Sequence, residues 1–297
     1  MQSHSKARRA PIVAIIGAGS VGCALGRRLH EKGWRIESVV TRSMGTATAA
    51  RRRIGGGVPQ AGRTQAVLGA DVVLISTPDR AIAETAEALA RIASSKAWRG
   101  KIVLHTSGAL GSDVLRPLAL RGASIGSLHP MQTFSGRTVP SLAGATFAIE
   151  GSAPAMRAAR RICRELGAVP VVIPQRRKSA YHAAAALAAG HILAVAEAAV
   201  RILMASGFSR KRAVLALLPL ARQTLANYER AGARPAWTGP LNRGDFGVIE
   251  RHLEALRRFP REYREAYDAL SRLGVKVLAN GSGAKKRQLE RTLARIK

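Results

Sequence analysis

The sequence of 297 residues predicts an α/β protein in which a parallel-sheet domain is followed by an all-helical domain. Two observations support this prediction. From Pro11 onwards, short apolar runs typical of strands alternate with helical patterns, as in a parallel sheet. After Pro174 only helical patterns follow. We therefore place the two domains at residues 11–174 and 175–279, between a disordered basic arm (residues 1–10) and a basic tail (residues 280–297).

The individual elements follow from local patterns of apolar residues and from the glycines and prolines that separate them. The expected strands are residues 11–16, 36–41, 72–76, 102–105, 123–128, 146–150 and 169–173, with a helix over 155–166 before the last of them. The expected helices of the second domain are residues 175–205, 209–231, 247–259 and 261–273.

Three glycines separate the first strand from the first helix, in the segment IIGAGSVG. Gly17, Gly19 and Gly22 have the G-x-G-x-x-G spacing of a loop that approaches a pyrophosphate closely, and Ser20 and Val21 begin a helix whose N–H groups face the phosphates. The basic residues before this segment also resemble the start of a secretion signal. The order of strand, glycine turn and helix favours the first interpretation and predicts a Rossmann dinucleotide-binding domain.

The composition limits the classes of partner and the cellular compartment. A net charge of +30 attracts nucleic acid and phosphorylated ligands, but the arginines are spread along the chain and only 4% of residues are aromatic, so a nucleic-acid function is not expected. The two cysteines, Cys23 and Cys163, provide neither a disulfide framework nor a metal site, which favours the cytoplasm.

An alanine-rich stretch, residues 180–200, is the one candidate for a membrane span. It contains His182, His191 and Glu197, and alanine contributes little to membrane insertion. We therefore expect a buried helix of a helical domain and no membrane association.

The end of the second strand carries the residues expected to select the nucleotide. An acidic side chain at this position selects NAD, whereas an arginine accommodates the 2′-phosphate of NADP. The chain has Arg42 and Ser43 there, and both can bind a phosphate. Glu37 is the acidic alternative, but it lies too early in the strand. The sequence therefore predicts NADP as cofactor.

Polar residues follow the later strands, at the sheet edge where doubly wound folds bind ligands. Thr77 and Pro78 are expected to contact the cofactor, and Asp79 to cap the next helix. His105 with Ser107, and His129 with Thr133, follow the next two strands. A single histidine is usually structural, but two at neighbouring strand ends favour contact with a substrate by at least one of them.

Together these segments resemble a family, the Rossmann-like proteins with a helical C-terminal domain of unknown function, which are related to pyrroline-5-carboxylate reductase, ketopantoate reductase and deazaflavin-dependent NADP oxidoreductase. The resemblance covers roughly residues 12–273. It implies NADP binding, reductase activity and a homodimer built through the helical domain. One departure is Gly190, where the family often has asparagine. The matching segments are IIGAGSVG, STPD, LHTSGAL, SLHPMQTF, FAIEG, KSAYHAAAALAAGH and TGPLNRGD.

The second domain begins with the residues expected to carry the chemistry. Lys178 and His182 lie four residues apart on one helix face, beside Tyr181, and resemble the lysine-plus-four arrangement of the β-hydroxyacid dehydrogenases, which have asparagine in place of this histidine. Either side chain can donate a proton. The alternative is a basic linker followed by a buried histidine. In TGPLNRGD, Thr238 and Arg243 are expected to bind an anionic substrate.

These residues predict an NADP-dependent reductase of a small anionic ketone or imine, such as a 2-keto acid or a cyclic imino acid. The alternative function is a sensor or regulatory protein that binds NADP without turning it over.

Overall fold

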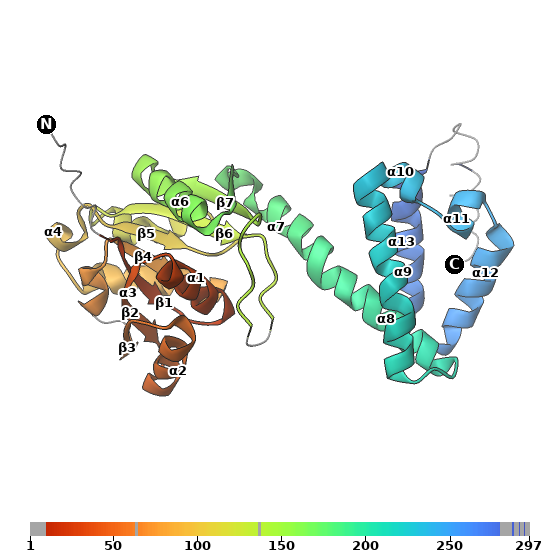
Figure 1. Cartoon of the computed structure of the whole chain (residues 1–297). Helices are drawn as coiled ribbons and strands as arrows, with labels where there is room; N and C mark the ends of the chain where they lie inside the picture. The colour runs from red at the N-terminus through yellow and green to blue at the C-terminus, as the bar shows by residue number, and fades with distance from the viewer. Residues whose placement is uncertain are drawn as a thin grey trace, which may run out of the picture. The chain divides into compact units, whose positions relative to one another are not determined.

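A computed structural model of the chain describes residues 10–62, 65–135 and 138–279, together with residues 287, 291 and 294. The predicted basic arm and most of the predicted basic tail lie outside these residues. The chain divides into two compact units, Met1–Ala189 and Gly190–Lys297, which we describe separately (Figure 1). The first unit continues past Pro174 because the helix that follows places Lys178 in its interior.

The first unit is built on an eight-stranded sheet in the order β3-β2-β1-β4-β5-β6-β7-β8. The strands are β1 (Ile12–Ile16), β2 (Arg35–Thr41), β3 (Val58–Ala61), β4 (Val72–Ile75), β5 (Ile102–His105), β6 (Ser124–Pro130), β7 (Thr146–Gly151) and β8 (Val169–Val172). The helices are α1 (Ser20–Glu31), α2 (Met44–Ile54), α3 (Ile82–Arg91), α4 (Ser95–Trp98), α5 (Arg116–Ala119), α6 (Ala153–Leu166) and α7 (Lys178–Ala186), with 3-10 turns η1 (Gln65–Gly69), η2 (Asp79–Ala81), η3 (Ser112–Leu115) and η4 (Gln175–Arg177).

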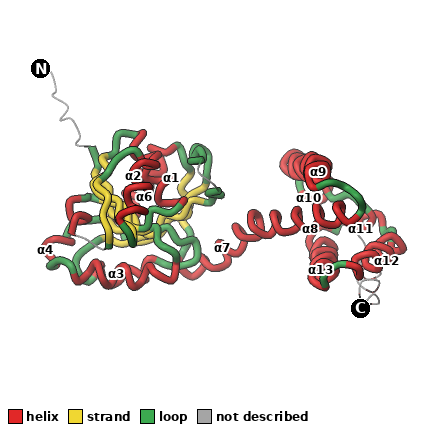
Figure 2. Tube along the Cα trace, turned by 90° about the horizontal axis from the view of Figure 1, so that it is seen from below, coloured by secondary structure: helices red, strands yellow, loops and turns green. Residues whose placement is uncertain are grey.

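Helices cover both faces of this sheet, with α1, α2 and α6 on one side and α3 and α4 on the other (Figure 2). Because of this cover, the side chains on both faces of the central strand β1 are buried. Val13 and Ile15 pack into the core under α1 and α6, whereas Ile12 and Ile16 pack into the core on the opposite face. A strand buried on both faces has no polar side, which is why β1 reads as a continuous apolar run.

The order β3-β2-β1-β4-β5-β6 is that of a Rossmann fold, and the parallel sheet expected from the sequence is confirmed for these six strands. β7 departs from it, because it pairs antiparallel with β6. A parallel pair needs a long crossover connection, usually a helix. Among the described residues between β6 and β7 no helix is present, so the chain returns along β6 in the opposite direction.

The second unit is all-helical, as the sequence predicts. Its helices are α8 (Ile192–Ala205), α9 (Arg210–Ala231), α10 (Ala233–Ala236), α11 (Pro240–Arg243), α12 (Phe246–Ala255) and α13 (Arg261–Leu278), with a 3-10 turn η6 (Leu256–Arg258), and a π-helical turn η5 (Leu187–His191) precedes α8. Its core is small and centres on Ile249, Leu253 and Val275.

The continuous helical stretch Gln175–Ala205 is long and apolar enough to cross a membrane by length and composition, with a mean hydropathy of 1.7. Only 6% of its apolar window is buried within the chain, so the expectation of a buried helix is wrong for a single copy. The start of the stretch is not membrane-like, because Lys178 is buried among polar groups of the first unit and Tyr181 bonds to His129.

Candidate functional site

A cleft of about 1240 Å³ lies at the carboxyl ends of the parallel strands, within the first unit. This is the edge at which doubly wound sheets bind ligands. One part of its wall is formed by residues 17–21 of the glycine loop, together with Arg42 from the end of β2. Another part is formed by Gly108, His129 and His182. The cleft therefore combines a phosphate-binding type of loop with titratable side chains.

The three glycines of the loop have different physical roles. Gly17 has a φ of 81°, and a β-carbon there would lie 2.5 Å from the backbone nitrogen of Thr77. A β-carbon at Gly22 would lie 2.5 Å from the carbonyl oxygen of Gly17. At Gly19 the same atom would meet nothing within 4 Å, so this side of the loop is open. The N–H groups of the first turn of α1 have no acceptor within the helix, and the loop thus fits a pyrophosphate.

The end of β2 brings Arg42 to the cleft, where Thr46 and Gly62 also line the wall. Ser43 is used differently from the prediction, because its hydroxyl accepts a hydrogen bond from the backbone N–H of Thr46 (3.3 Å) and caps α2. Its hydroxyl is therefore engaged within the protein and Ser43 does not line the cleft.

Glu37, the acidic alternative to Arg42, does not line the cleft either. Its carboxylate forms an ion pair with Arg35 at 2.5 Å and lies against Gly69 of η1. This geometry agrees with the argument that Glu37 comes too early in the strand to meet a ribose.

The loops after β4 and β5 are joined by a hydrogen bond from the Ser107 hydroxyl to the Asp79 carboxylate, at 2.7 Å. The same hydroxyl accepts the backbone N–H groups of Ala109 and Leu110. The predicted N-cap role of Asp79 is wrong, because Pro78 occupies the cap position of η2 and Asp79 lies inside it. Thr77 and Pro78 line the cleft, as expected of residues that contact a cofactor.

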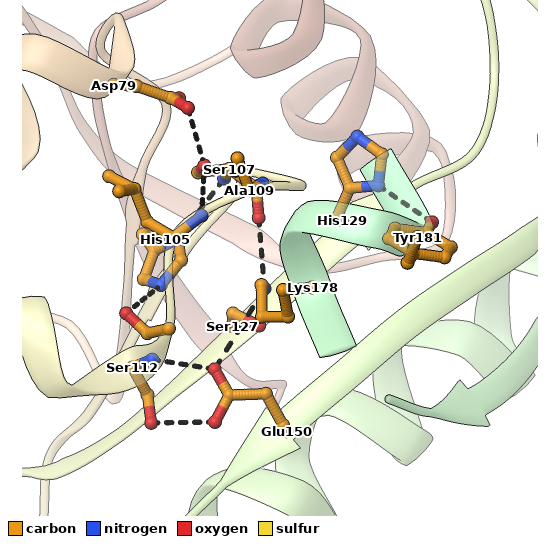
Figure 3. A network of polar contacts seen from close by, with 12 residues as sticks. Asp79, His105, Ser107, Ala109, Ser112, Ser127, His129, Glu150, Lys178 and Tyr181 are labelled. Carbon is orange, nitrogen blue, oxygen red and sulfur yellow. Dashed lines mark hydrogen bonds and ion pairs between the residues drawn. The ribbon is translucent and has the colours of Figure 1, made fainter. Parts of the chain in front are cut away.

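His105 is fully buried below this loop and does not line the cleft (Figure 3). Its Nδ1 accepts the N–H of Ser107 (3.2 Å), so its Nε2 carries the proton and donates to the carbonyl of Gly111 (3.1 Å). Burial, and next the charge of Lys178, lower the pKa of His105 to about 3. His105 is thus neutral and buried, and this geometry does not support its predicted contact with substrate.

Lys178 is only 1% exposed and lies under the Ser107 loop. Its ammonium group donates to the carbonyl of Ser107 (3.1 Å) and to the hydroxyl of Ser127 (2.6 Å), and the Glu150 carboxylate is 3.9 Å away (Figure 3). Burial lowers the pKa of Lys178 to about 8 against the opposing charges of Glu150 and Asp79. Since Lys178 does not line the cleft, the geometry does not support its predicted role as proton donor.

Glu150, from β7, anchors this buried network. Its carboxylate accepts hydrogen bonds from the backbone N–H (2.6 Å) and the hydroxyl (2.8 Å) of Ser112. Glu150 belongs to the FAIEG segment, but the spacing of residues gave no sign that it would meet a lysine of the next domain. Strands β6 and β7, the loops after β4 and β5, and α7 are thereby joined by one network.

His129 and His182 line the cleft, and Tyr181, which does not line it, contacts His129. His129 Nδ1 is 2.9 Å from the Tyr181 hydroxyl, and the rings of His129 and His182 meet edge to face with centroids 5.5 Å apart (Figure 3 shows the first contact). Burial, followed by the charges of His182 and Lys178, lowers the pKa of His129 to about 4. Burial raises the pKa of Tyr181 to about 12, so its phenol keeps its proton.

The remaining predicted substrate residues do not line the cleft. Thr133 is exposed, although its neighbours Gln132 and Phe134 in the same segment line the wall. Thr238 and Arg243 belong to the second unit, where Arg243 pairs with Asp245 at 2.8 Å. Their contact with substrate stays a prediction. Other residues that line the cleft and were not predicted are Thr46, Gly62, Arg80 and Glu84.

Several solved structures have a similar fold. A provisionally assigned NADP oxidoreductase from Bacteroides fragilis is 23% identical, with a TM-score of 0.74 over 89% of this chain and 97% of that one. A reductive aminase from Aspergillus terreus, solved with NADPH and ethyl-5-oxohexanoate, is 17% identical, with a TM-score of 0.68 over 97% and 100%. A pyrroline-5-carboxylate reductase from Coxiella burnetii is 14% identical, with a TM-score of 0.55 over 94% and 97%.

Family comparisons agree with this fold. A search of curated proteins found no significant match. Residues 2–130 match the Rossmann-like domain, and residues 145–273 match a domain of unknown function, DUF2520. The resemblance inferred from the sequence segments is thereby confirmed. The chain consists of an N-terminal Rossmann-like domain followed by a DUF2520 domain.

Proposed function

We propose that the protein is an NADP-dependent oxidoreductase that reduces a small anionic ketone or imine, of the 2-keto acid or cyclic imino acid type. One observation carries this proposal: a single cleft is lined by an open glycine loop, by Arg42 and by two histidines. Similar folds described as an NADP oxidoreductase and as a reductive aminase in complex with NADPH support the cofactor and the reaction class.

The cofactor would be held along the glycine loop. The backbone at Gly19, Ser20 and Val21 faces the open side of the loop, where it can bind the pyrophosphate. Arg42 would bind the 2′-phosphate, and Thr77 and Pro78 lie in position to contact the remainder of the cofactor. When bound, the reduced nicotinamide supplies the hydride.

The protein must supply a proton to the oxygen or nitrogen that is reduced. Of the two candidates on α7, His182 lines the cleft and Lys178 does not, so we assign the proton donor to His182. The net charge of +30 favours the approach of anionic substrates. Cys23 and Cys163 are both free and buried, which supports a cytoplasmic location for the reaction.

NADPH oxidation, followed over a panel of 2-keto acids and cyclic imino acids, tests this function. We expect turnover with at least one compound of the panel and none without it. Tight binding of NADPH with no oxidation across the panel, extended to neutral ketones and imines, would instead favour the alternative of an NADP sensor.

We also propose that the protein is a homodimer. Large apolar side chains are exposed along α8 and α9, including Leu193 (71% exposed), Leu215 (64%) and Leu220 (65%). A second copy presents the same apolar faces, and two-fold pairing is the commonest way in which soluble proteins bury such faces. Light scattering at micromolar concentration is expected to give twice the mass of 31.5 kDa, and a monomer mass would contradict the proposal.

A further inference from the structure

The two histidines of the cleft converge on one backbone position, Gly108. A β-carbon built on Gly108 would lie 2.5 Å from His182 Nδ1 and 2.8 Å from His129 Nε2. The absence of a side chain thus allows both imidazole nitrogens to approach the loop after β5. His182 Nδ1 is buried and has no hydrogen-bond partner among the described residues. The other nitrogen of His129 is engaged by Tyr181.

The charges around this pair disfavour a positive charge on His129. His182 and Lys178 act against it, and among the described residues the Asp79 carboxylate is the acidic group that favours it. His129 acts in the same unfavourable sense on His105. Burial, His182 and Lys178 all disfavour charge on His129, whose pKa of about 4 keeps it neutral above about pH 5.

Resting on the function proposed above, we propose that His129 and His182 act as one proton-transfer pair that carries a single proton, which His182 delivers to the substrate. The hydride of the reduced nicotinamide forms a bond to the carbon of the C=O or C=N group, and the π electron pair moves to the heteroatom. The heteroatom takes the proton from His182, which becomes neutral and is protonated again from solvent. Tyr181 is a positioning residue, which holds His129 with Nε2 towards Gly108.

Two consequences separate this pair from two independent histidines. Because the charge of His182 lowers the proton affinity of His129, the titration of His129 must change when His182 is replaced. In addition, the orientation of His129 must depend on Tyr181. Both can be measured on the cofactor-free protein, and neither requires that a substrate be known.

The test is a pH titration of the histidine ring signals by NMR in the full-length protein without cofactor. In His182→Gln, we expect His129 to titrate at higher pH, because the neighbouring group that most strongly opposes its positive charge is gone. In Tyr181→Phe, the ring nitrogen signals of His129 are expected to change from one tautomer to a mixture. Unchanged His129 signals in both variants would overturn the proposal.

The chain contains a matched control. His252 Nδ1 is 2.8 Å from the Tyr267 hydroxyl, with rings edge to face and centroids 5.8 Å apart, but this pair lies in the second unit and no second histidine contacts it among the described residues. Tyr267→Phe is expected to change the signals of His252 and to leave those of His129 unaltered.

Gly108→Ala provides a further variant, should His182→Gln or Tyr181→Phe fail to fold. Gly108 does not have a positive φ, so alanine is not strained there, but its methyl group must displace both imidazoles. We expect altered signals for both His129 and His182, whereas signals that match the wild type would contradict the convergence. Coupled titration without any reductase activity would disprove the proposed function and leave the pair established.

Discussion

Replacement of His182 by glutamine is expected to lower turnover by roughly 100- to 10,000-fold while the affinity for NADPH stays nearly unchanged. His182 lines the cleft together with Gly108 and His129 and does not belong to the glycine loop. Glutamine keeps a hydrogen-bonding group at this position but cannot titrate. The pH profile gives a second readout. A protonated donor is needed, so turnover of the wild type must fall as pH rises through its ionisation, and this limb must flatten in the variant.

The control for this experiment is His252→Gln, the same substitution at an exposed histidine of the second unit. It is expected to leave both turnover and pH profile unaltered. Near-normal turnover in His182→Gln would show that the proton comes from another group, and His129, which lines the same cleft, would be the next residue to test.

Arg42→Glu is expected to weaken NADPH binding by at least about 10-fold and NADH binding far less. A hydrogen bond between a charged donor and a phosphate contributes about 1.5–3 kcal/mol, and about 1.4 kcal/mol corresponds to a factor of ten in affinity. The introduced carboxylate adds repulsion against the 2′-phosphate, which NADH lacks. Calorimetric titration with both nucleotides measures the two effects separately.

Arg121→Glu is a matched control, because it makes the same change in net charge at an exposed arginine that does not line the cleft. It should leave the preference for NADPH intact. Equal affinity of the wild type for NADH and NADPH would contradict the assignment of Arg42 and return attention to Glu37, whose carboxylate would then have to leave Arg35.

The fold was predictable from sequence where burial is complete. β1 is apolar throughout, and β5 is apolar up to its last residue, His105, because helices cover both faces of the sheet; the positions of both strands agree with the predictions within a residue. β3 was missed because its four residues, VPQA, are partly exposed and include a proline, so no apolar run marks it. The antiparallel direction of β7 was also not predictable, since an apolar strand pattern carries no information on direction.

Some features of the site were predictable from the sequence, and others were not. The expectation that His129 lies at a strand end beside the loop of Ser107 is correct, because parallel strands end at one edge of the sheet. The prediction that Lys178, Tyr181 and His182 lie at the start of one helix is correct, and both Tyr181 and His182 contact His129. Helical spacing gave no indication that Lys178 would be buried, because its burial depends on long-range contacts with Ser127 and Glu150 that no local pattern encodes.

Hydride transfer itself tests the central claim most directly. NADPH that carries deuterium on the transferred position of its nicotinamide ring is incubated with the protein and the compounds of the keto and imino acid panel, and the products are analysed by mass spectrometry. A reductase must place one deuterium on the carbon of the former C=O or C=N group, at a rate that His182→Gln lowers and His252→Gln does not. Binding of NADPH with no deuterium in any product would contradict the account.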